Sequence, residues 1–147
     1  MHIETIDPHK STSFYTMDEI ADFLFTALQQ YGDERQHIMK CLKYAISDDP
    51  SKGGSITLAE EDGRLVGVVV TNKTGMDGYI PENILVYIAV EPGQRGKGTG
   101  KALMEHVIDH TPGDIALHVE PENPARRLYE RLGFTNKYLE MRLHKKN

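Results

Sequence analysis

The first third of the chain carries its apolar residues at helical spacing. Between residues 20 and 28 they fall three or four positions apart, directly after Thr16-Met17-Asp18-Glu19, which has the form of a capping box. A helix is therefore predicted from Thr16 until Gly32. A second apolar stripe, between residues 38 and 46, predicts another helix that ends at Asp48-Asp49-Pro50.

From residue 55 the pattern becomes that of a sheet. Two runs, 55–60 and 64–71, flank Glu61-Asp62-Gly63 and predict a hairpin, and the run 84–90 is nearly all apolar, as in a buried strand. The pattern then predicts a helix over 98–110, a strand over 115–119, a helix over 123–132 and a strand over 137–143. This succession indicates an α/β (mixed α+β) fold with helices on the faces of a central mixed sheet.

Composition favours a soluble globular protein. The 147 residues are 39% hydrophobic and 27% charged, and we expect one domain over residues 1–147. No apolar run reaches the roughly 20 residues that span a bilayer, and no secretory signal is visible, so neither a membrane partner nor export is expected. Cys41 is the only cysteine, which excludes an intramolecular disulfide and favours the cytoplasm.

The net charge of −5 is unevenly distributed. Residues 1–50 hold four Lys/Arg and nine Asp/Glu, whereas the rest of the chain is balanced. An acidic chain is not expected to bind nucleic acid. The acidic half is either a solvated surface or the approach of a cationic partner. The carboxylates that could line such an approach are Asp18, Glu19, Asp22, Asp33 and Glu34.

The most informative segment joins the apolar run 84–90 to the next predicted helix. Its sequence is Glu91-Pro92-Gly93-Gln94-Arg95-Gly96-Lys97-Gly98-Thr99-Gly100-Lys101. Glycines let backbone N–H groups approach a ligand closely, and a helix start adds unpaired N–H groups and the positive end of the helix dipole. The segment therefore predicts a phosphate or pyrophosphate site.

Other interpretations of this segment fit less well. A Walker A loop would need Gly where Arg95 stands and Ser or Thr where Ala102 stands. A dinucleotide fingerprint beginning at Gly96 would need a third glycine at Lys101, and it normally follows the first strand of its fold. A plain glycine-rich turn is the remaining alternative.

Two motifs resemble those of the GCN5-related N-acetyltransferase (GNAT) superfamily. Arg95-Gly96-Lys97-Gly98-Thr99-Gly100 matches its Arg/Gln-x-x-Gly-x-Gly/Ala motif. Residues 123–134 resemble its second motif, Asn-x-x-Ala-x-x-Leu-Tyr-x-x-x-Gly-Phe, with one residue missing after Asn123. The resemblance implies an acyl-CoA N-acyltransferase-like fold with a largely antiparallel sheet, and acetyl-CoA as the acetyl donor.

The resemblance also implies which residues bind acetyl-CoA. The turn from Arg95 to Lys101, with Gly96, Lys97, Gly98, Thr99 and Gly100 between them, would bind the pyrophosphate. The preceding strand would pair with the pantetheine arm through Ile88, Ala89 and Val90, much as an added strand would. Asn123 would reach the same molecule.

Tyr129 corresponds to the family's tyrosine near the thioester sulfur. Its alternative role is packing, because it shares an apolar helical stripe with Ala125, Leu128 and Leu132. A reference tyrosine pKa of about 10 exceeds a thiol pKa of about 8.5, so we interpret Tyr129 first as a hydrogen-bond donor to the leaving sulfur.

The general base is less evident. The family often places a carboxylate near the start of the central strand, where Ile84 and Leu85 are apolar and Glu82 lies just before. Tyr87 and Glu120 are the other candidates. Cys41 lies on an apolar helix face and is expected in the core rather than as a nucleophile.

The sequence as a whole indicates an acetyl-CoA-dependent N-acetyltransferase, an acyltransferase acting on an amine-bearing small molecule or peptide by direct attack in a ternary complex. The alternatives are a non-catalytic CoA-binding sensor and another nucleotide-phosphate binder, and a homodimer is left open. His106 and His110 lie four apart, but Val107 stands where a zinc motif needs Glu, so exposed histidines and no metal site are expected.

Overall fold

A five-stranded sheet organises the first of two compact units in this computed structural model. The structure describes residues 1–94 and 96–146, and the units are Met1–Leu117 and His118–Asn147. The strands lie in the order of the chain, and all neighbours are antiparallel except β4 and β5, which are parallel. They are β1 (His2–Ile6), β2 (Gly54–Glu61), β3 (Arg64–Lys73), β4 (Asn83–Val90) and β5 (Ile115–Leu117). The predicted mixed, largely antiparallel sheet is therefore confirmed.

Three helices accompany this sheet, and a fourth lies in the second unit. They are α1 (Met17–Leu28), α2 (Arg35–Ala45), α3 (Thr99–His110) and α4 (Ala125–Arg131), with short 3₁₀ turns η1 (Gln29–Tyr31) and η2 (Pro92–Gln94). Each predicted helix exists, with ends within a few residues of those expected. None of the helices in the described part of the chain has the length and apolar character needed to span a membrane.

The first helix begins as its sequence predicts. The Glu19 N–H donates to Thr16 Oγ1 at 3.1 Å, and the Thr16 N–H donates to Glu19 Oε1 at 3.0 Å, so the capping box is complete. Ile20, Ala21 and Leu24 follow it on the buried face.

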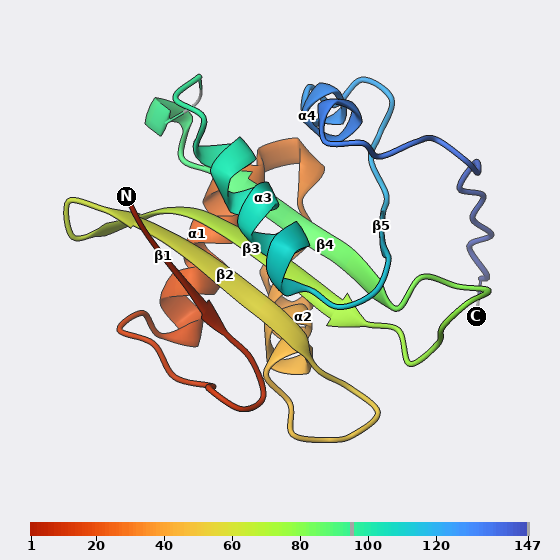
Figure 1. Ribbon diagram of the computed structural model, residues 1–147, viewed down its shortest axis with the longest axis horizontal. Helices are drawn as coiled ribbons and strands as arrows, with labels where there is room; N and C mark the ends of the chain where they lie inside the picture. The colour runs from red at the N-terminus through yellow and green to blue at the C-terminus, as the bar shows by residue number, and fades with distance from the viewer. Residues whose placement is uncertain (95, 147) are drawn as a thin grey trace. The chain divides into compact units, whose positions relative to one another are not determined.

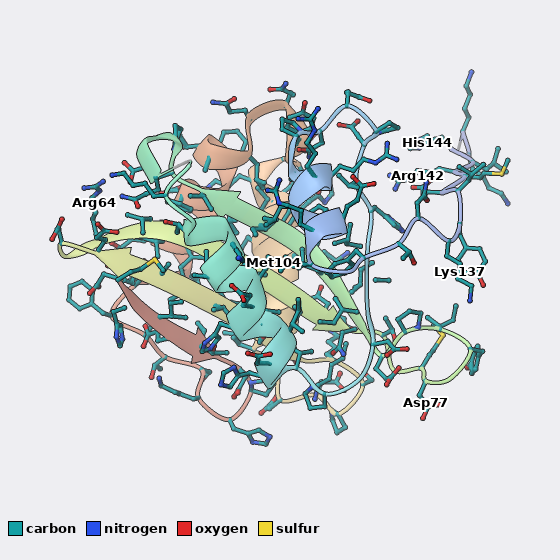
Figure 2. All side chains as sticks on the ribbon, turned by 45° about the horizontal axis from the view of Figure 1, so that its top comes forward. Arg64, Asp77, Met104, Lys137, Arg142 and His144 are labelled. Atoms are coloured by element: carbon teal, nitrogen blue, oxygen red, sulfur yellow. The ribbon has the colours of Figure 1, made fainter. Side chains whose placement is uncertain are left out.

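The sheet is covered on both faces (Figure 1). Side chains along β3 alternate between the two faces of the sheet. Those of Val68 and Val70 belong to the hydrophobic cluster that packs against α1 and α2. Gly67 points the other way. A Cβ built there would lie 2.5 Å from Leu103 Cδ1, so α3 packs tightly over this position. Met104, labelled on α3 in Figure 2, is completely buried on this side.

A β-bulge interrupts β4 at Val86. Val70 of β3 pairs with Tyr87, but the next residue, Thr71, pairs with Leu85, which leaves Val86 as the extra residue. Beyond the bulge, Tyr87 and Ala89 belong to the α1/α2 core, whereas Leu85 does not. The bulge thus changes which side chains of β4 face the α1/α2 side.

Two strand predictions differ from the structure. β1 was not predicted, because in its five residues only Ile6 is buried and no alternation stands out. The strand over 137–143 is wrong, since no strand forms in the described residues of the second unit. Its alternating apolar side chains Leu139, Met141 and Leu143 are 82–90% exposed, and a strand needs a paired neighbour to be stable. The single domain over 1–147 stays a prediction.

Candidate functional site

The glycine turn between β4 and α3 forms an uncapped helix start. Gly96 and Gly98 have φ values of +82° and +81°, in the left-handed region that favours glycine. Gly98 is the residue before α3 and makes no side-chain cap. The first intrahelical bond comes from the Ala102 N–H to the Gly98 carbonyl at 3.0 Å, so the N–H groups of Thr99, Gly100 and Lys101 have no partner within the helix.

The turn is also open on its outer side. Ideal Cβ atoms built on Gly93, Gly96 and Gly98 meet no atom within 4 Å. The exposed side chains of Lys97 and Lys101 add positive charge. An anion can therefore approach the backbone closely, so the residues present fit a pyrophosphate. Arg95, which the sequence places in the same site, lies outside the described residues.

Two buried polar residues brace the turn from within. Gln94 and Thr99 are each 4% exposed, and Thr99 Oγ1 donates to Gln94 Oε1 at 3.3 Å. The Gln94 N–H also donates to the Glu91 carbonyl at 2.8 Å, and Glu91 pairs with Arg64 at 3.0 Å. Arg64 is labelled in Figure 2. Sequence reasoning missed Gln94, since a buried glutamine inside a polar turn gives no periodic signal.

The strand that leads into the turn has one open edge. β4 pairs with β5 only from Asn83 to Leu85, although its pairing with β3 continues to Val90. Ile88, Ala89 and Val90 therefore lie on the stretch that has no β5 partner. The side chains of Ile88 and Val90 are half-buried, and that of Ala89 is buried. An extended ligand could add its own amides to this edge.

Glu82 lies at the opposite end of β4 from the glycine turn. Its half-buried side chain lines a cleft of about 220 Å³ with Lys52, Lys73 and Met76. Glu82 lies four positions before Val86 of the bulge, which corresponds to about 13 Å along a strand. This separation is too large for direct contact with a group bound at the bulge.

Tyr87 makes the most distinctive polar contact on β4. Its side chain is 6% exposed, and its Oη donates to Asp33 Oδ2 at 2.5 Å, across 54 positions in the chain. Burial first, and then the Asp33 carboxylate, raise the pKa of Tyr87 well above its ordinary value. Tyr87 is therefore a donor here and is poorly suited to act as a base. Asp33 itself lies in the exposed connection between η1 and α2.

Cys41 is unsuited to covalent catalysis. It packs against the α1/α2 core, and burial raises the pKa of its thiol to about 12, so the reactive thiolate is disfavoured at neutral pH. This confirms the expectation that Cys41 belongs to the core.

The second unit holds the other two predicted site residues. Tyr129 is 7% exposed and its ring lies 5.9 Å from that of Phe134. Burial raises the pKa of Tyr129 to about 12. Asn123 Oδ1 accepts the Ala125 N–H at 2.9 Å, which helps to start α4. Glu120, a weaker candidate base, is exposed.

The histidines of α3 differ from expectation in one respect. His110 is exposed, but His106 is half-buried and its Nε2 lies 3.2 Å from Thr5 Oγ1 of β1. The two rings stack with centroids 4.1 Å apart. Across residues 1–94 and 96–146, no group of three or more His, Cys, Asp or Glu side chains is arranged to hold a metal ion.

The model of the acetyltransferase (GNAT) family matches residues 14–134. This chain belongs to that family. The match begins before α1 and ends after α4, so it includes both the glycine turn and Tyr129. The resemblance that the two motifs carry is thus confirmed over most of the chain.

Individual relatives are similar over about half of this chain. An L-2,4-diaminobutyric acid acetyltransferase of Nocardia farcinica is 38% identical over 81 residues, which are 49% of this chain and 38% of the relative. A 5-NmdU N-acetyltransferase of Pseudomonas phage PaMx11 is 36% identical over 84 residues, 56% of this chain and 58% of its own length. The chain thus spans less than two thirds of the length of these relatives.

Solved structures agree over nearly the whole chain. An aminoglycoside N-acetyltransferase in complex with CoA superposes with a TM-score of 0.70, covering 99% of this chain and 96% of that chain at 17% identity. A ribosomal-protein-alanine N-acetyltransferase from Brucella melitensis gives a TM-score of 0.66, with 99% and 100% coverage at 21% identity. At such low identity, these similarities establish the fold.

Proposed function

We propose that this protein transfers the acetyl group of acetyl-CoA to an amine acceptor by direct attack in a ternary complex. The observation that carries the proposal is the uncapped, open start of α3 directly after the unpaired edge of β4. Family membership supports acetyl transfer, and nothing in the described residues favours a non-catalytic CoA sensor. The cytoplasm, a reducing compartment, is proposed as the location, and the single cysteine Cys41 supports it because an intramolecular disulfide is impossible.

The chain would hold acetyl-CoA mainly through its backbone. The unpaired N–H groups of Thr99, Gly100 and Lys101 would bind the pyrophosphate beside the backbone of Gly96 and Gly98, and Arg95, Lys97 and Lys101 would add charge. The open edge of β4, at Ile88, Ala89 and Val90, would pair with the amides of the pantetheine arm. On the resemblance alone, Asn123 adds a further contact.

The reaction needs a neutral amine. Its nitrogen lone pair forms a bond to the acetyl carbonyl carbon, the carbon–sulfur bond breaks, and CoA leaves as a thiolate. The nitrogen loses one proton and the sulfur gains one, so the products are an N-acetylated amine and the CoA thiol. Neutralising an amine with a pKa of about 10.4 at pH 7 costs about 4.6 kcal/mol, which a base or desolvation must offset.

Tyr129 would assist the leaving sulfur by hydrogen bonding. Its pKa of about 12 lies well above the reference thiol value of about 8.5, so complete transfer of its proton would cost about 5 kcal/mol. A hydrogen bond from the Tyr129 hydroxyl to the negatively charged sulfur, without complete proton transfer, requires less free energy. The position of Tyr129 at the sulfur rests on the family motif.

Glu82 is proposed as the base, acting through a chain of water molecules because it lies about 13 Å along β4 from the bulge. Glu82→Gln should lower kcat/KM by tenfold or more at pH 7 and remove one limb of its pH profile. The nearby cleft residue Met76, replaced by Leu, is the matched control. If Glu82→Gln keeps both the rate and the full pH profile of the parent protein, Glu82 is not the base.

The decisive experiment measures thiol release and amide formation together. The purified chain is supplied with acetyl-CoA and a panel of amines, including 2,4-diaminobutyrate and an aminoglycoside, which the names of similar proteins suggest. Equal amounts of free thiol and N-acetylated product are expected with at least one acceptor. CoA binding by calorimetry without amide formation for any amine or peptide would refute the proposed function.

A further inference from the structure

Asp33 differs in its hydrogen-bond partner from the other four carboxylates that could line the approach of a cation. Asp18 and Asp22 both pair with Arg35, at 3.0 and 2.7 Å. Glu19 completes the capping box of α1, and Glu34 accepts a hydrogen bond from Gln36 Nε2 at 2.9 Å. The partners of these four side chains all lie on α1, on α2 or directly before α1, whereas the partner of Asp33 lies on the sheet.

Asp33 has no cationic partner among the described residues. Its one hydrogen bond there comes from the neutral hydroxyl of Tyr87, which leaves the negative charge uncompensated. That charge also reaches inward, because Asp33 contributes to raising the pKa of both Tyr87 and Cys41. The arrangement suits a cation from solution. Tyr87 fixes one oxygen of the carboxylate, and the other oxygen can accept a hydrogen bond from an ammonium group.

The position of this carboxylate relates it to the open edge of β4. Tyr87 is the first residue after the bulge, on the stretch that has no β5 partner. Its ring packs with the α1/α2 core, whereas the glycine turn leads into α3 on the other side of the sheet (Figure 1). A ligand at Asp33 would therefore reach the bulge from the α1/α2 side, while acetyl-CoA would bind from the α3 side.

From these contacts we infer that Asp33, held in place by Tyr87, binds a second cationic group of the acceptor, and that the preferred acceptors are diamines. The inference rests on the proposed function and specifies its substrate class. Asp33 is assigned to binding of the acceptor and not to removal of its proton. The ammonium group at Asp33 stays protonated while the other amine of the same molecule reacts.

Tyr87 is a positioning residue in this arrangement. Without its hydroxyl, the Asp33 side chain would sample several rotamers on an exposed connection. Removing the Tyr87 hydroxyl should therefore weaken diamine binding, but less than removing the charge of Asp33 does.

The test compares 1,4-diaminobutane with butylamine, which have the same carbon chain and differ by one ammonium group. In Asp33→Asn, KM for 1,4-diaminobutane should rise at least tenfold, whereas kcat and all constants for butylamine change less than threefold. Tyr87→Phe should raise KM for the diamine about threefold. Asp48→Asn, at an exposed carboxylate after α2 and with an equal charge change, is the control and should behave as the parent protein.

Calorimetry separates this inference from the proposed function. Binding of 1,4-diaminobutane to the protein saturated with CoA should weaken at least tenfold in Asp33→Asn, with unchanged CoA affinity, whether or not turnover occurs. Diamine binding that is equal in the parent and in Asp33→Asn would overturn the inference, as would equal effects on diamine and butylamine kinetics. Failure of the parent to form any amide would refute the proposed function instead.

Discussion

The glycine turn and the Asp33–Tyr87 pair are built in opposite ways. At the turn, the groups proposed to bind the ligand are backbone N–H groups of consecutive residues, exposed by glycines with φ near +80°. At the pair, the proposed binding group is the Asp33 carboxylate before α2, which is held by a tyrosine hydroxyl 54 positions away on β4. A backbone site needs only a local motif, whereas a side-chain site depends on which residues the fold brings together.

The backbone site should be the more sensitive of the two to a single added side chain. Gly98→Val introduces a β-branched residue at φ +81°, where L residues are strained, and fills space that is open in the structure. We expect CoA affinity to fall more than tenfold by calorimetry, with the fold retained by circular dichroism.

Gly63→Val is the matched control for strain. Gly63 has φ +76° in the β2–β3 hairpin, and its Cβ would also meet no atom within 4 Å. Gly63→Val should lower the free energy of unfolding about as much as Gly98→Val does, and it should leave the affinity for CoA unchanged. Equal loss of affinity in both variants would mean that strain, rather than occupation of the turn, weakens binding.

Tyr129 tests whether a side chain also matters at the donor site. Tyr129→Phe keeps the ring and removes the hydroxyl, so kcat should fall about tenfold with little change in KM for acetyl-CoA. Full activity with a characterised acceptor would make Tyr129 a packing residue only.

The pH dependence of the parent gives a second check on Tyr129. Because burial raises its pKa to about 12, the hydroxyl keeps its proton, and its ability to donate, as the pH rises through neutrality. Loss of this proton should therefore lower kcat only as the pH approaches about 12. A fall in kcat near pH 9 that disappears in Tyr129→Phe would contradict the raised value.

Salt should have the smallest effect, and it is measured at saturating acetyl-CoA so that screening of the lysines at the glycine turn does not contribute. If the acidic connection steers a cationic acceptor, kcat/KM should fall several-fold between low and physiological salt, over a Debye length of about 8 Å. Replacing Asp33 and Glu34 by Asn and Gln together should flatten this slope. Glu61→Gln with Asp62→Asn, on the remote β2–β3 hairpin, makes the same charge change and should leave the slope intact. If kcat/KM of the parent protein does not change with salt, the acidic half of the chain is only a solvated surface.

Much of the fold followed from local patterns. The capping box at Thr16, the hairpin at Glu61-Asp62-Gly63 and the helix after the glycine turn formed where the sequence placed them, because each depends on neighbouring residues. The strand over 137–143 did not form, although its alternation is clear. Alternation shows which side chains could share a face, but a strand exists only where another backbone is available to pair with it.

The sequence by itself determined the family and the candidate donor site. Glycines, an uncapped helix start and an apolar strand lie within fifteen residues or so, and their chemistry hardly depends on the rest of the chain. Only the tertiary structure singled out the candidate acceptor site. The bulge at Val86 turns Tyr87 toward α1 and α2, and the packing of these helices brings Asp33 to its hydroxyl. In the sequence, Asp33 is one of nine acidic residues among the first fifty, and nothing local distinguishes it. Contacts between distant residues are fixed by packing and register, which no local pattern encodes.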